Sequence, residues 1–134
     1  MHTDCRWKQR FQNFEKSFLS MQELVPITSL TKTERAALIK YFEMTFKLSW
    51  KVLKDYLEEA GYNPKSPQET LKQALQMELI TEGYEWLNAL DKRNLTTHTY
   101  DEAISQEVAL LIQEQFAPLL QKLYQHFKPL YDQH

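Results

Sequence analysis

The segment RNLTTH, Arg93 to His98, together with Tyr100, places three reactive kinds of side chain within eight residues. A guanidinium can clamp a phosphate and stabilise the negative charge that develops on its oxygens. An imidazole can accept or deliver a proton near neutral pH. These are the roles needed to cleave RNA by attack of its own 2′-hydroxyl, so the segment indicates phosphodiester chemistry without a metal ion.

This chemistry needs both an acid and a base, and the segment offers one histidine per chain. Either Tyr100 assists His98, or two protomers share a composite cleft. A structural interpretation also stands, in which Arg93, His98 and Tyr100 cap carbonyls at a helix junction and complete a polar network. An arginine and a histidine five positions apart form a weak pattern, which by itself leaves these interpretations open.

The geometry of a regular helix separates the reactive groups. Arg93 and Tyr100 are seven residues apart and would share one face, whereas His98 would point well away from it. The asparagine and threonines between Arg93 and His98 are weak helix formers whose side chains can bond to nearby backbone. We therefore expect a distortion within this segment that turns His98 toward Arg93, or a second chain that completes the cleft.

Other titratable residues offer less. His126 lies among glutamines and lysines and is expected to be solvated, and Cys5 has no histidine near it in sequence. His2 and His134 are terminal. No His/Cys cluster has the spacing of metal ligands, and no glycine-rich phosphate loop is present. We expect no metal ion and no cofactor.

Apolar residues at helical spacing predict the elements that must position this segment. Two glycines in the chain leave few tight turns, which disfavours a many-stranded β fold. The prediction is an all-α, antiparallel up-and-down helical bundle of about five helices with a four-helix-bundle core, forming a single domain over residues 1–134. The expected helices are Asp4–Leu24, Lys32–Ala60, Pro67–Leu79, a fourth that carries Trp86, Leu87 and Leu90, and Asp101–Leu130.

Turn and capping signals mark the ends of these helices. Thr31 followed by Glu34 fits a capping box, and Gly61 suits the residue just after a helix end. Gly83 is expected to break or bend the third helix. Pro118 should kink the last helix or split it in two.

The second predicted helix is apolar on more than one flank. Tyr41, Met44, Leu48 and Val52 widen the apolar surface beyond the core-facing stripe. A homodimer interface is the preferred explanation, with a more enclosed monomer core as the alternative. The opposite side of this helix carries four lysines: Lys40, Lys47, Lys51 and Lys54. They could bind phosphate, but their position opposite the core is where a solvent-exposed face is expected.

Composition limits the classes of partner. The chain is 43% hydrophobic and 25% charged, a balance typical of soluble globular proteins. Its net charge of −2 gives no general attraction for nucleic acid, so RNA contact would need a local patch. One cysteine fits a reducing cytosol, and the absence of a long apolar run predicts no membrane span. A cytoplasmic protein is expected.

The chain resembles the HEPN superfamily, in particular the branch of nucleotidyltransferase substrate-binding proteins that includes HepT toxins. The resemblance runs from about Arg6 to Tyr124. Its specific element is an R-x4-H-x-Y signature, met by Arg93, His98 and Tyr100, and Asn94 also matches the form usual in that branch. The stretches that carry it are WKVLKDYLEEAGY, SPQETLKQALQMELI, WLNALDKRN and HTYDEAISQEVALLI.

The resemblance implies a dimer in which the motifs of two chains line a shared cleft. HepT-like members are metal-independent RNase toxins, with transfer RNA among the suggested targets, and an MntA-type nucleotidyltransferase neutralises them by adding AMP units to the motif tyrosine. Carried over, Arg93 and His98 are catalytic, Asn94 is a supporting polar neighbour, and Tyr100 is the modified residue. The alternatives are a non-catalytic substrate-binding subunit of such a transferase, and a helical dimerisation domain with no reaction.

Overall fold

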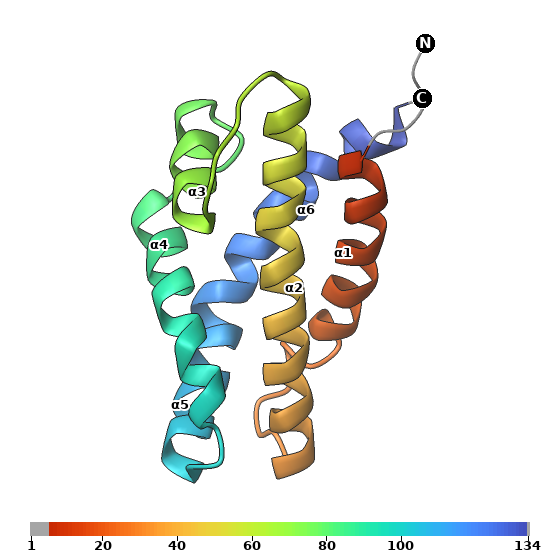
Figure 1. Cartoon of the computed structure of the whole chain (residues 1–134). Coiled ribbons are helices and arrows are strands. Elements are labelled where there is room, and N and C mark those ends of the chain that lie inside the picture. The colour runs from red at the N-terminus through yellow and green to blue at the C-terminus, as the bar shows by residue number, and fades with distance from the viewer. Residues whose placement is uncertain (1–5, 134) are drawn as a thin grey trace.

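The computed structural model describes residues 6–133, and the secondary structure in that range is entirely helical (Figure 1). The predicted all-α class is confirmed. Along the chain the elements are α1 (Arg6–Gln22), α2 (Lys32–Glu59), α3 (Pro67–Gln76), α4 (Gly83–Lys92), the 3₁₀ helix η1 (Arg93–His98), α5 (Glu102–Leu111), the π-helical segment η2 (Ile112–Phe116) and α6 (Ala117–Asp132).

Helices α1 and α2 run antiparallel and form one side of the bundle (Figure 1). The aromatic residues of α1 face inward, since Phe11 and Phe14 have no exposed surface. Tyr124 of α6 stacks on this stripe, with its ring centroid 4.8 Å from that of Phe18. The inward face of α1 therefore packs against both α2 and α6.

The capping signals around α2 are confirmed. The Glu34 amide donates to Thr31 Oγ1 at 3.1 Å, and the Thr31 amide donates to Glu34 Oε1 at 2.9 Å. After α2, Gly61 has a φ of +101°, and its amide donates to the Glu58 carbonyl. Glycine adopts this left-handed conformation at little cost, which explains why the helix ends there.

Helix α3 ends at Gln76, earlier than the predicted Leu79, and Gly83 does not end it. Glu78 has a φ of +60°, and the Glu78 and Leu79 amides donate to carbonyls of the last turn. This is a Schellman arrangement with glutamate in the usual glycine position. Gly83 instead starts α4, where a Cβ atom would lie 2.7 Å from Leu75 Cδ1, so glycine permits the close packing of α4 on α3.

The predicted last helix is divided, as the proline in it indicated. Pro118 lies in the first turn of α6, directly after η2. Proline donates no amide hydrogen, and a π-helical turn before it lets the chain continue with altered hydrogen bonding. In Figure 1, α6 crosses behind α2 toward the start of α1. There, Lys8 Nζ donates to the Gln133 carbonyl at 3.1 Å.

The second apolar flank of α2 belongs partly to the core. Val52 has no exposed surface and belongs to the core, which agrees with the alternative of a more enclosed monomer core, whereas Met44 is 45% exposed. Tyr41 and Leu48 are half-buried between these extremes. The predicted homodimer interface therefore rests on a smaller exposed surface than the sequence indicated. Among residues 6–133, no helix combines the length and apolar content that a membrane span requires.

Candidate active site at the junction of α4 and α5

The segment Arg93–His98 forms η1, which continues α4 without an intervening turn. Its threonines explain the change of helix type. Thr96 Oγ1 donates to the Arg93 carbonyl at 2.7 Å, and Thr97 Oγ1 donates to the Asn94 carbonyl at 2.9 Å. Such side-chain bonds to the carbonyl three residues earlier compete with the α-helical amide ladder. The predicted distortion of this segment is confirmed.

His98 and Tyr100 lie together on the surface at the end of η1. His98 Nδ1 is 3.4 Å from the Tyr100 hydroxyl, and the ring centroids are 6.0 Å apart with planes at 71°. Tyr100 is 85% exposed, and His98 is exposed as well. The imidazole and the phenol can therefore share a hydrogen bond while both side chains remain exposed.

Arg93 and Asn94 border a hollow of about 420 Å³ between the start of α3 and the end of α4. Neither His98 nor Tyr100 lines this hollow. On a 3₁₀ helix, residues five apart differ in direction by about 120°, so the distortion does not bring Arg93 and His98 to one face. The other residues that line the hollow are Ser66, Pro67, Gln68, Leu87, Leu90 and Asp91.

The chain after Tyr100 is held by a cap at the start of α5. Asp101 Oδ1 accepts hydrogen bonds from the Ala103 and Ile104 amides at 2.9 and 3.2 Å. The Asp101 amide donates to the His98 carbonyl at 3.1 Å. The turn that carries Tyr100 is therefore fixed at both ends by ordered helices.

Arg35 of α2 also positions this junction, although the sequence interpretation did not single it out. Its side chain is buried; Nε donates to Ser105 Oγ at 3.1 Å, and the guanidinium donates to the Glu102 carboxylate. Both partners belong to the first turn of α5. The sequence could have indicated this role. Arg35 lies three residues before Leu38 and so on the core-facing side of the helix, where a buried charge needs a partner.

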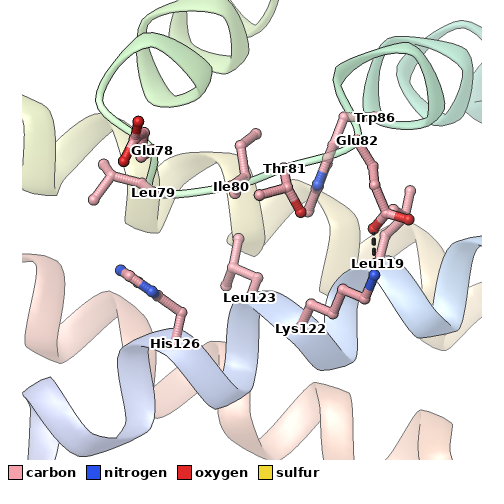
Figure 2. Close-up of a pocket in the computed structure, with 10 residues that line it drawn as sticks. All are labelled: Glu78, Leu79, Ile80, Thr81, Glu82, Trp86, Leu119, Lys122, Leu123 and His126. Carbon is pink, nitrogen blue, oxygen red and sulfur yellow. Dashed lines mark hydrogen bonds and ion pairs between the residues drawn. The ribbon is translucent and has the colours of Figure 1, made fainter.

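A second hollow lies away from this junction, beneath the connection between α3 and α4, with a volume of about 130 Å³ (Figure 2). The ion pair of Lys122 with Glu82, at 2.7 Å, closes one end, and His126 stands at the other. His126 is exposed, as the sequence indicated. Cys5, His2 and His134 lie outside the described residues. Within residues 6–133, no group of three or more His, Cys, Asp or Glu side chains could hold a metal ion.

Known proteins share this sequence and fold. A probable ribonuclease HepT from Haemophilus influenzae is 32% identical over 90 residues, which cover 63% of this chain and 59% of that protein. The chain thus spans less than two thirds of that relative. A crystal structure of a Thermus thermophilus protein superposes with a TM-score of 0.78 at 30% identity, covering 86% of this chain and 98% of the other.

The family comparison covers most of the described chain. Residues 9–129 match the model of the family described as nucleotidyltransferase substrate binding protein like. This range extends from α1 to α6 and contains η1 and the whole α4–α5 junction. The resemblance stated from the sequence is confirmed, and the chain belongs to the nucleotidyltransferase substrate binding protein like family.

Proposed function

We propose that this chain is a metal-independent endoribonuclease of the HepT-like toxin type. The observation that carries the proposal is the distorted α4–α5 junction, which exposes His98 and Tyr100 together at the end of η1, while Arg93 at its start borders a hollow. The match to a probable ribonuclease HepT supports it. The substrate would be RNA, with transfer RNA as one target class.

Each motif residue has a role that its surroundings permit. His98 would transfer the proton between the 2′-hydroxyl and the departing oxygen. Arg93 would hold the phosphate, since its guanidinium forms no ion pair within residues 6–133. The Tyr100 hydroxyl, 3.4 Å from His98 Nδ1, would help to orient the imidazole. Asn94, which is exposed beside Arg93, would supply a further hydrogen bond.

The reaction would take place in a homodimer. Arg93 and His98 of one chain point to different sides of η1, and one chain contributes one motif histidine. A second protomer would complete the cleft, so that the arginine of one chain and the histidine of its partner act on the same phosphate. This arrangement also supplies both an acid and a base.

Regulation would act through Tyr100. A cognate MntA-type nucleotidyltransferase would add AMP to its exposed hydroxyl and thereby place negative phosphate charge next to His98. The family description supports a transferase partner. The modification would both block the cleft and repel the phosphates of RNA.

The decisive experiment is an RNA cleavage assay in EDTA with protein whose intact mass shows no added AMP. We expect cleavage by the unmodified chain and a loss of at least about 100-fold for His98→Ala. His126→Ala is the matched control, because it removes an exposed histidine far from the junction. Undiminished cleavage by His98→Ala would remove His98 from the mechanism.

A second candidate function is favoured by the family description itself, which names substrate binding for a nucleotidyltransferase. In this case the chain would present a substrate, or its own Tyr100, to the transferase without cleaving RNA. The same assay separates the candidates: a stable complex with the transferase together with no cleavage by unmodified protein supports the binding role. Co-purification alone does not, since both candidates require it.

A further inference from the structure

The hollow beside Arg93 has the size and wall chemistry of a small-ligand site. Its volume of about 420 Å³ falls within the usual range for such pockets. Leu87, Leu90 and Pro67 provide apolar wall, and both leucines also pack against the core, so the wall is anchored. Gln68 and Asn94 add amide groups at the rim. A flat, partly polar ring would fit these surroundings.

Two opposite charges line the hollow without neutralising each other. Asp91 and Arg93 form no ion pair with each other or with any other described residue. At the start of α3, Pro67 has no amide hydrogen and the Glu69 amide donates to Ser66 Oγ at 3.1 Å, so these two residues offer an anion no free amide. Asp91 is exposed and Arg93 half-buried, so a ligand that combines a hydrogen-bond donor edge with a phosphate could bind both side chains together.

We propose that this hollow is a nucleoside subsite, resting on the proposed function, which seats the base next to the phosphate held by Arg93. The Asp91 carboxylate accepts a hydrogen bond from an exocyclic amine of the base. Cytosine offers such an amine, whereas uracil presents a carbonyl oxygen that a carboxylate repels. The Gln68 amide can turn to suit either base, so Asp91 decides the preference.

The test measures binding separately from cleavage. Fluorescence anisotropy with short 2′-O-methyl oligocytidine and oligouridine uses probes that lack the attacking hydroxyl and stay intact. We expect the unmodified full chain to bind oligocytidine about tenfold more tightly, the ratio for one hydrogen bond to a charged group. Asp91→Asn should reduce this ratio to about two or less, because an amide can donate to uracil as well as accept from cytosine.

Glu85→Gln is the matched control, since Glu85 is an exposed carboxylate on the same helix that does not line the hollow. Both substitutions remove one negative charge and should raise general RNA affinity, so only the base preference identifies the subsite. Equal binding of the two oligonucleotides by the unmodified chain overturns the proposal. An unchanged preference in Asp91→Asn, or an equal loss in Glu85→Gln, overturns it too.

The binding assay and the cleavage assay can fail separately. If the base preference depends on Asp91 but the chain cleaves no RNA, the result supports the subsite and contradicts the proposed catalytic function. If cleavage requires His98 but the chain shows no base preference, the result supports the catalytic function and contradicts the proposed subsite.

Discussion

At the scale of single residues, Tyr100 combines accessibility with a contact to the proposed proton carrier. It is 85% exposed, and its hydroxyl lies 3.4 Å from His98 Nδ1. A phosphate attached to this oxygen would carry its charge directly to the imidazole. A modification of Tyr100 would therefore change the surroundings of His98 by proximity alone, without any movement of the helices.

We expect Tyr100→Phe to abolish AMP addition by the cognate transferase. Co-expression followed by intact mass measurement should show AMP increments on the unsubstituted chain and none on the variant. Tyr84→Phe is the control, because Tyr84 is 79% exposed but lies outside the junction. Increments that persist on Tyr100→Phe would place the acceptor elsewhere, and increments lost from Tyr84→Phe would point to a docking effect.

The candidate residues of the junction could be named from the sequence, but the contacts around them could not. Arg93, His98 and Tyr100 lie close together along the chain, and the threonines between them already indicated a distortion. The wall of the hollow joins Pro67 to Arg93 across separate helices. Arg35 meets a partner 67 positions away. Spacing along one element cannot report such contacts, because they depend on how the helices pack.

At the scale of elements, Arg35 links the start of α2 to the start of α5. We expect Arg35→Met to lower the free energy of unfolding by about 1–2 kcal/mol, since Ser105 Oγ loses its donor and Glu102 its ion pair. The expected loss of stability is small because the Glu102 side chain is 58% exposed, and water weakens an exposed ion pair. Denaturant unfolding measures this, with Lys40→Met, an exposed position on α2, as a control that should change stability little. Equal effects of the two substitutions would mean that the link contributes nothing.

The connection between α3 and α4 contains a conformation that glutamate adopts at a cost. Glu78 has a φ of +60° and its side chain makes no hydrogen bond or ion pair within the described residues. We expect Glu78→Gly to raise the free energy of unfolding by up to about 1 kcal/mol. Glu85→Gly, within α4, should lower it by about 1 kcal/mol. Thermal unfolding of both variants gives the comparison, and a destabilised Glu78→Gly would contradict the assigned backbone cost.

At the scale of the whole molecule, α6 packs on α1 and ends near its start, so the two ends of the described chain lie close together (Figure 1). Tyr124 donates to Glu15 Oε2 at 2.6 Å, and Lys128 Nζ lies 2.9 Å from the same oxygen. Near the end of α6, Gln12 Nε2 donates to the Tyr131 hydroxyl at 2.7 Å. This polar seam covers the aromatic core and holds α6 against α1.

The carboxyl of Glu15 makes this seam sensitive to acid. Burial raises the pKa of Glu15, but the hydrogen bonds from Tyr124 and Lys128 outweigh it, so the pKa lies below the usual 4.5. Between the folded and unfolded values the unfolded chain binds more protons than the folded chain. The stabilisation by Glu15 is therefore fully present above about pH 4.5 and is lost as the pH falls through the lower, folded pKa.

We expect Glu15→Gln to reduce the free energy of unfolding by about 1 kcal/mol at pH 7, because an amide replaces the charged acceptor of two hydrogen bonds. As the pH falls below 4.5 the unsubstituted chain should lose this advantage, and the two stabilities should converge. Urea unfolding at a series of pH values measures the difference. Glu23→Gln is the control, since Glu23 is exposed and forms no ion pair within residues 6–133. A difference that stays constant with pH would show that Glu15 stabilises α6 by packing and not by its charge.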